Sequence, residues 1–224
     1  PVMQISCRDR NKIALQSDIL GANALGIKNI LCITGDSVKA GDQQDSKAVH
    51  EFESVRLLQQ IQAFNKGIDP TFGELLDKKT VIFSGAAADP NCKNQRILKK
   101  RILKKKEAGA RFIQTQMVME KDNLTKFCEN ISNPLEIPVI AGVFLLKSYK
   151  NALFINKYVP GASIPENIIN RLKNAKEPLR EGIEIAAEQA HDFINIANGI
   201  HIMAVKTEHL IPEIIEKAGI NLEY

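Results

Sequence analysis

The chain has 224 residues, of which 44% are hydrophobic and 25% charged, which suits one large folded domain and excludes global disorder. The net charge of +4 permits an anionic small molecule as a ligand and does not require nucleic acid. The four cysteines form no CxxC pair and no long apolar run occurs, so we expect reduced thiols, a cytoplasmic protein, no metal site and no membrane.

Short apolar runs of strand length alternate with longer amphipathic segments, a pattern typical of βα units and a parallel sheet. The expected strands are apolar or β-branched at nearly every position, as strands covered on both faces should be. In chain order the expected strands are 2–7, 29–33, 80–84, 111–116, 138–143 and 201–205. The expected helices are 12–25, 54–64, 94–108, 124–130, 148–157, 165–174, 178–198 and 209–218. Glycines stand where helices should stop, at Gly26, Gly109, Gly199 and Gly219.

Six strand–helix units are visible, whereas a complete (β/α)8 barrel has eight in about 250 residues. We therefore expect an α/β fold, a TIM (β/α)8 barrel that is incomplete in this chain, with residues 1–224 forming a single domain. A doubly wound sheet is the alternative. The chain opens on a strand-like run at Pro1 without an initiator Met, which either Met removal or upstream trimming explains.

Polar residues gather at the ends of the expected strands, where parallel α/β proteins bind their ligands. They are Cys7-Arg8-Asp9 at the end of the first strand, Thr34-Gly35-Asp36 after the second, residues 85–90 after the third, and Gln114-Thr115-Gln116 inside the fourth. A Gly-Asp pair is usually a turn, and the small residues 85–88 could reflect close packing. A buried unsatisfied amide, however, costs about 1–3 kcal/mol, so the glutamines favour a binding site.

The basic helix at 93–106 allows two interpretations. Its lysines could form a solvated surface whose alkyl stems cover apolar neighbours. Alternatively, a subset of these cations could neutralise the pyrophosphate of a cofactor. Nucleic-acid binding ranks third, because the patch is confined to one helix without interleaved aromatic residues.

Five segments of the chain resemble the methylenetetrahydrofolate reductase family, in the family's order and with similar spacing. They are residues 1–36, FSGAAADP at 83–90, KKKEAGARFIQTQ at 104–116, IPVIAGVFLLKS at 137–148 and GIHIMAVKTEH at 199–209. The most diagnostic parts are ITGD and AGARFIQTQ. The resemblance covers essentially the whole chain and begins at the third βα unit of the family's barrel, so the N-terminal two units are expected to be missing.

The resemblance implies an oxidoreductase of one-carbon metabolism and methionine biosynthesis. Its barrel would hold FAD, or FMN in some members, over the carboxyl ends of the strands. Hydride would pass from NAD(P)H or another donor to the flavin, and then to 5,10-methylenetetrahydrofolate, giving 5-methyltetrahydrofolate with ping-pong kinetics. A homo-oligomer, or a complex with a redox partner subunit, would fit the family.

The resemblance also assigns site residues. Asp36 would tune the flavin and stabilise the cation that forms when the folate ring opens. Gln116 would contact both pterin and nicotinamide, and Phe52 would cover the adenine. The remaining cofactor positions are Gln4, Ser6, Thr34, Gly35, Gly85, Ala86, Ala87, Asp89, Arg101, Lys104 and Lys105.

One part of the family's machinery is not found in this sequence. In the family the general acid is a glutamate on the first barrel strand, which belongs to the two units expected to be missing here. Two other functions therefore stay open. The chain could be a catalytically incomplete flavin- or folate-binding subunit of a larger complex, or a folate-dependent methyltransferase barrel that needs no flavin.

Overall fold

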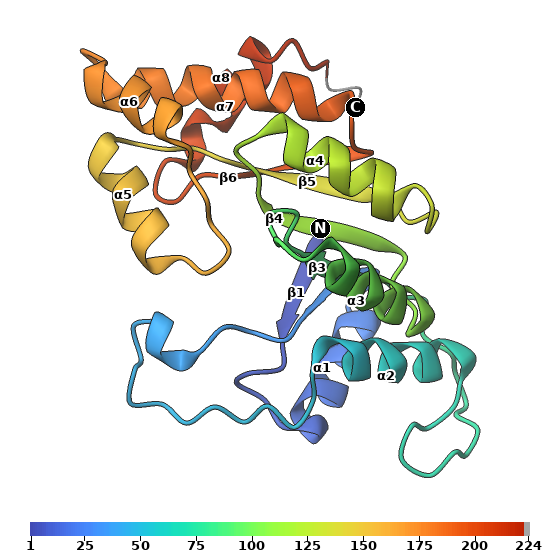
Figure 1. Cartoon of the computed structure of the whole chain (residues 1–224). Helices are drawn as coiled ribbons and strands as arrows, with labels where there is room; N and C mark the ends of the chain where they lie inside the picture. The colour runs from blue at the N-terminus through green and yellow to red at the C-terminus, as the bar shows by residue number, and fades with distance from the viewer. Residues whose placement is uncertain (222–224) are drawn as a thin grey trace. The chain divides into compact units, whose positions relative to one another are not determined.

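The computed structural model describes residues 1–221, in which parallel strands alternate with helices (Figure 1). The strands are β1 (Val2–Ser6), β2 (Asn29–Ile33), β3 (Phe83–Ala88), β4 (Phe112–Met117), β5 (Val139–Phe144) and β6 (Gly199–Met203). They form a six-stranded sheet in the order β1-β2-β3-β4-β5-β6, and the pairs β1–β2, β2–β3 and β5–β6 are parallel. A doubly wound sheet would reverse its strand order at a switch point, whereas a (β/α)8 barrel keeps the order of the chain. The expected fold class, an incomplete (β/α)8 barrel, is confirmed.

A helix follows each strand and provides the crossover that parallel pairing requires. The helices are α1 (Lys12–Ala24), α2 (Ser54–Lys66), α3 (Gln95–Glu107), α4 (Lys121–Phe127), α5 (Tyr149–Tyr158), α6 (Glu166–Asn174), α7 (Pro178–Ile194) and α8 (Ile211–Lys217). A π-helical turn (Cys128–Ser132) extends α4, and short 3-10 turns occur at Val38–Ala40 and Glu208–Leu210.

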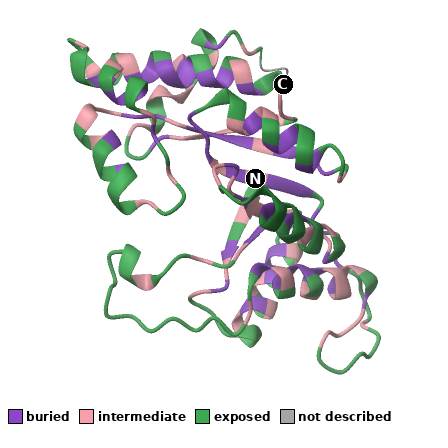
Figure 2. Ribbon diagram, viewed as in Figure 1, coloured by how far each residue is buried: buried purple, intermediate pink, exposed green. Residues whose placement is uncertain are grey.

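The chain divides into two compact units. Unit 1 consists of Pro1–Ala87 and Arg96–Ile113, and unit 2 of Ala88–Gln95 and Gln114–Tyr224. Buried residues lie along β2, β3, β4 and β5 and along one side of the flanking helices (Figure 2). The single-domain organisation expected from the sequence stays a prediction.

Each unit has its own core. In unit 1 the largest fully buried side chains of α1 and α2 are Leu15, Ile19, Leu57, Leu58 and Ile61. In unit 2 a cluster joins the end of β4 to α5, α6 and α7 and contains Met117, Met119, Leu146, Ala152, Ile155, Ile164, Ile168, Ile169, Leu172 and Ile185. Each fully buried aliphatic side chain contributes about 1.5–3 kcal/mol, so these clusters stabilise the strands that carry the polar residues.

The third strand differs from its expected position, because it begins at Phe83 instead of Thr80. The side chain of Asn65, at the end of α2, takes the place of a neighbouring strand. Its Oδ1 accepts hydrogen bonds from Ile82 N at 3.0 Å and Thr80 Oγ1 at 2.6 Å, and its Nδ2 donates to Ile82 O at 2.9 Å. Residues 85–88 therefore lie within β3 instead of following it, and Asp89 is the first residue after the strand.

The glycine rule holds at three of its four positions. Gly26, Gly109 and Gly219 have positive φ angles and follow the ends of α1, α3 and α8. The prediction that Gly199 ends a helix is wrong, because α7 ends at Ile194 and Gly199 begins β6. The reason is Asn198, whose N donates to Val139 O at 2.9 Å and whose Oδ1 accepts from Val139 N at 3.0 Å. These two bonds hold Asn198 beside β5, so α7 cannot extend to residue 198 as the sequence pattern predicted.

Candidate functional site

In unit 1, Gly35 and Asp36 follow β2 and pack against the end of β1. Gly35 has a φ of +92°, and a Cβ at this position would lie 2.5 Å from Ser6 Oγ and 2.6 Å from Arg8 Cβ. The Arg8 guanidinium donates to Asp36 O at 3.4 Å, and Arg8 N donates to Ser6 Oγ at 3.2 Å. Three predicted residues, Ser6, Gly35 and Asp36, are thus gathered at the carboxyl ends of two neighbouring strands, and the Asp36 side chain is exposed.

Thr34 has a structural partner that the sequence did not indicate. Its Oγ1 accepts from Ser54 N at 3.2 Å and donates to Ser54 Oγ at 3.3 Å. Ser54 is the first residue of α2, and the N-cap residue Glu53 makes no capping bond through its side chain. The Thr34 hydroxyl therefore satisfies the N-terminus of α2, which limits what it can offer to a flavin.

The predicted residues on β1 and β3 differ in how they are placed. Gln4 is exposed and lies on the same face of β1 as Ser6, since side chains two apart point the same way. Ala86, by contrast, is fully buried. A Cβ on Gly85 would overlap the ring of Phe112, so the glycine makes room for an aromatic side chain of its own unit. Close packing, the simpler of the two sequence interpretations, thus accounts for Gly85.

Lys105 projects from α3 onto the end of β3. Its Nζ donates to Ala87 O at 2.6 Å. Burial lowers the pKa of Lys105, the cation of Arg101 lowers it further, and the carboxylate of Glu53 opposes them. A partly desolvated ammonium beside a second cation lacks sufficient counter-charge, which a phosphate oxygen would supply. Lys104, the third predicted cation of α3, is exposed.

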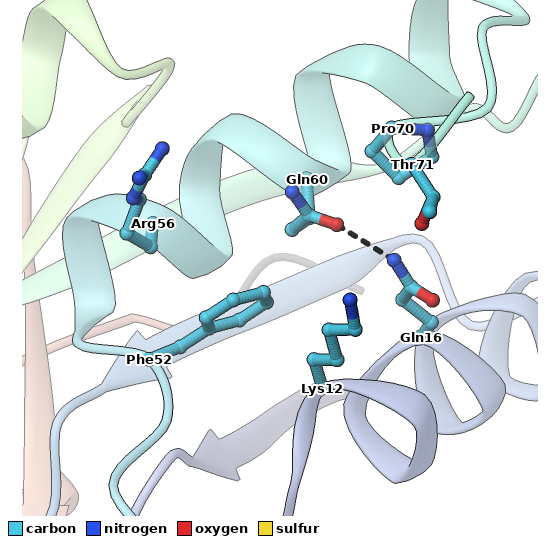
Figure 3. Close-up of a pocket in the computed structure, with 7 residues that line it drawn as sticks. All are labelled: Lys12, Gln16, Phe52, Arg56, Gln60, Pro70 and Thr71. Carbon is cyan, nitrogen blue, oxygen red and sulfur yellow. Dashed lines mark hydrogen bonds between the residues drawn. The ribbon is translucent and has the colours of Figure 1, made fainter. Parts of the chain in front are cut away.

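A cavity of about 250 Å³ lies between α1 and α2 in unit 1 (Figure 3). Its lining comprises Lys12, Gln16, Phe52, Arg56, Gln60, Pro70 and Thr71. Phe52 is the predicted residue among them, and its ring projects into the space between the two helices (Figure 3). Gln16 Nε2 donates to Gln60 Oε1 at 2.8 Å and links the helices. An aromatic face beside two cations suits a planar, anionic group.

The sequence reasoning missed the four polar residues of this cavity that lie on α1 and α2. The available signal was their spacing, because positions four apart share one helix face. Lys12 and Gln16 have that spacing on α1, as do Arg56 and Gln60 on α2.

In unit 2, Gln116 and Asp89 lie beside the connection between α5 and α6. Gln116 Nε2 donates to Pro160 O at 3.3 Å, and its Oε1 accepts from Met117 N at 2.9 Å. Asp89 Oδ1 accepts from Asn91 N at 2.9 Å. Burial raises the pKa of Asp89, and the hydrogen bonds from Asn91 oppose that rise. No sequence pattern had indicated Asn91 or Pro160 as part of a site.

The other polar residues of β4 have partners within unit 2. Gln114 Nε2 lies 2.9 Å from His201 Nδ1, and burial lowers the pKa of this histidine. Thr115 Oγ1 accepts from Gly142 N at 2.9 Å. The nitrogen of the half-buried Gln114 amide, which had favoured a binding site, therefore has a partner within the sheet itself.

The predicted residues thus fall into separate groups. Unit 1 holds the residues at the ends of β1 and β2, the Ala87–Lys105 contact and the Phe52 cavity, while unit 2 holds Asp89 and Gln116. That these groups share one ligand stays a prediction. Among residues 1–221, no three His, Cys, Asp or Glu side chains are grouped as a metal site would require, and every helix is too short or too polar to span a bilayer.

Comparison with known proteins connects this arrangement to curated relatives. The chain is 27% identical over 238 residues to methylenetetrahydrofolate reductase 2 of Schizosaccharomyces pombe, covering 97% of the chain and 35% of that protein. It is 23% identical over 229 residues to the probable methylenetetrahydrofolate reductase (NADPH) of Caenorhabditis elegans, covering 98% and 32%. The chain therefore spans about a third of the length of these relatives.

The chain is also similar to a solved structure and matches a protein-family model. The structure is an uncharacterised protein from Clostridium thermocellum, described as binding two copies of 5-methyl-5,6,7,8-tetrahydrofolic acid. It has a TM-score of 0.51 and 13% identity, covering 97% of this chain and 93% of that one, which is a likeness of fold alone. The family model named methylenetetrahydrofolate reductase matches residues 1–219. Because that match covers nearly the whole chain, this chain belongs to the methylenetetrahydrofolate reductase family.

Proposed function

We propose that the protein containing this chain reduces 5,10-methylenetetrahydrofolate to 5-methyltetrahydrofolate by ping-pong hydride transfer through a bound flavin. The observation that carries the proposal is the placement of Asp36 at the end of β2. Its backbone is held by Gly35 and Arg8 at the carboxyl end of β2, while its carboxylate stays exposed to a ligand. A fixed carboxylate at this edge can stabilise the positive charge that develops as the folate ring opens.

The residues around β3 fit the polar tail of a flavin. Lys105 is partly desolvated and feels the charge of Arg101, so a phosphate group there would be attracted to both cations. A bound flavin would accept a hydride from one substrate and deliver it to the next. We propose FAD, because FMN has no adenine to place beside Phe52 in the cavity between α1 and α2.

Gln116 is the proposed contact for the pterin and for the nicotinamide of NAD(P)H. Both ligands carry an amide-type edge, and a carboxamide has the donor and acceptor that such an edge requires. The Clostridium thermocellum protein of similar fold is described as binding methyltetrahydrofolate, which supports folate as the ligand class.

The proposal is tested on the full-length protein by separating the two half-reactions. We expect a yellow protein whose flavin absorbance is bleached by NADH or NADPH and restored by methylenetetrahydrofolate. Asp36→Asn should slow the second step by roughly 10²–10³-fold, because the substitution removes a charge that acts in the transition state. A flavin-loaded protein in which Asp36→Asn slows neither step would contradict the role of Asp36, and a colourless protein would contradict the reductase assignment.

A second candidate is a flavin- or folate-binding subunit that works only within a complex. The observation that favours it is the sheet, in which β1 and β6 each have one neighbouring strand. Unpaired edges are commonly covered by another segment or chain. The same preparation separates the two candidates, because a binding subunit would take up flavin or folate and turn over only after a partner chain is added.

A further inference from the structure

Asn91 lies between β3 and α3, and both the nitrogen and the oxygen of its side-chain amide make hydrogen bonds. Nδ2 donates to Met117 O at 3.2 Å and to Gly161 O at 3.1 Å, while Oδ1 accepts from Asn123 Nδ2 at 3.3 Å. A primary amide has two N–H donors, and both are used here. Asn91 therefore ties the α5–α6 connection, through Gly161, to the end of β4.

The same connection holds Gln116. Its Nε2 donates to Pro160 O and its Oε1 accepts from Met117 N. Because a carbonyl oxygen only accepts and a backbone N–H only donates, these two partners decide which end of the Gln116 carboxamide is nitrogen. One N–H and one oxygen lone pair remain. The amide can thus present a donor and an acceptor, in a fixed order, to a ligand.

The α5–α6 connection fits closely against these side chains. Gly161 has a φ of +78°, and a Cβ there would lie 2.9 Å from Asp89 Oδ2 and 3.8 Å from Gln116 Cγ. Asp89 in turn accepts a hydrogen bond from Asn91 N. The position of the Pro160 carbonyl is therefore set by packing on Asp89 and by the bond from Asn91.

We propose that Asn91 is a positioning residue for the reaction: by holding Gly161 it keeps the Pro160 carbonyl against Gln116, and so keeps the carboxamide in one orientation. This inference rests on the proposed function, since it takes Gln116 to be the group that contacts folate or nicotinamide. Without the Asn91 amide, the Pro160 carbonyl withdraws. The Gln116 carboxamide is then held by the bond from Met117 N alone, and its N–H groups lose their fixed direction in front of the ligand.

The test uses the full-length protein and two measurements: the rate at which methylenetetrahydrofolate reoxidises the reduced flavin, and hydrogen exchange of backbone amides in residues 159–164. Asn91→Ala should lower the rate by about tenfold, the loss expected for a removed hydrogen-bond constraint, and should speed the exchange. Asn91→Asp should do the same, because a carboxylate has the same shape but cannot donate. The matched control is Asn195→Ala, which removes one local amide bond to His191 O in the same unit and should change neither quantity.

A double-mutant comparison separates positioning from a merely structural role. If Asn91 acts through Gln116, then Asn91→Ala in a Gln116→Ala background should lower the rate by less than about twofold, while the faster exchange persists. Equal losses in both backgrounds would overturn the proposal. An active wild type with an impaired Gln116→Ala and an unimpaired Asn91→Ala would overturn the positioning role alone. A wild type that does not reduce the folate would overturn the proposed function and this inference with it.

Discussion

The two units place their candidate residues by different means. In unit 1 close packing on glycines positions them: Gly35 fits against Ser6 and Arg8 only without a side chain, and Gly85 makes room for the ring of Phe112. In unit 2 side-chain amides do it, because Asn91 and Gln116 bind backbone groups of the α5–α6 connection. Polar residues at the ends of parallel strands can thus be positioned by close packing in one unit and by a hydrogen-bond network in the other.

Gly35→Ala should have the largest effect on stability. It combines a left-handed backbone with contacts to Ser6 Oγ and Arg8 Cβ that leave no room for a methyl group. We expect the free energy of unfolding to fall by about 2–4 kcal/mol, measured by urea denaturation. The control is Gly21→Ala in α1, where no atom lies within 4 Å of the new Cβ and which should be neutral or stabilising. Equal losses for both variants would contradict the packing argument.

Lys105→Met should weaken flavin binding by roughly 10- to 100-fold, the range expected when a charge-assisted hydrogen bond to a phosphate is lost. Titration of the apoprotein with FAD, followed by fluorescence quenching, measures this. Lys100→Met, on the same helix and exposed, is the comparison and should bind FAD as the wild type does. A Lys105 variant with unchanged affinity would leave this lysine with a purely structural bond to Ala87.

Gly161→Ala tests the corresponding glycine of unit 2 and should cost less than Gly35→Ala. Its φ is also positive, but the nearest obstacle is the carboxylate end of Asp89, which can rotate away. We expect a loss of about 1–2 kcal/mol in the free energy of unfolding. If this loss equals or exceeds that of Gly35→Ala, the proposed difference between packing in unit 1 and hydrogen bonding in unit 2 is wrong.

Asp89→Asn should have the smallest effect, and its sign depends on pH. Burial raises the pKa of Asp89, so the folded state binds more protons than the unfolded state above the ordinary value of 3.8. The contribution of Asp89 is therefore most favourable below pH 3.8 and is lost as the pH rises through the raised value. At pH 7 we expect the amide variant to be slightly more stable than the wild type, by less than about 1 kcal/mol because the group is half exposed. Thermal unfolding at pH 7 and near pH 4 measures the difference, which should shrink towards acid.

The sequence predicted the ends of β1, β2, β4 and β5 to within one residue because their signal is local. Asp36 and Gln116 are polar residues at the ends of apolar runs, and their positions needed only the strand boundaries. The predictions for β3 and β6 were wrong: β6 lies two residues earlier than predicted, and Ile82, just before β3, is bound by Asn65 and not by a strand. Local periodicity cannot distinguish those two partners.

The network around Asn91 was out of reach for a different reason. Its partners Met117 and Gly161 lie 26 and 70 residues away along the chain, and neither sequence position has a distinctive pattern. A glycine in a loop usually indicates a turn, and only the backbone angle of Gly161 together with the nearby Asp89 shows that it is a packing position. Such pairs become visible only when the fold has brought the elements together.

The anchor at Asn65 has a consequence for how this chain can vary. Because the side chain at the end of α2 holds Ile82 directly, the start of β3 does not depend on the path of the intervening residues 67–79. That segment closes on itself, through a bridge between Ile68 and Leu75. Residues can therefore be inserted or deleted at its tip without shifting the pairing of Gly85 with Leu31, so the length of this hairpin is uncoupled from the alignment of the sheet.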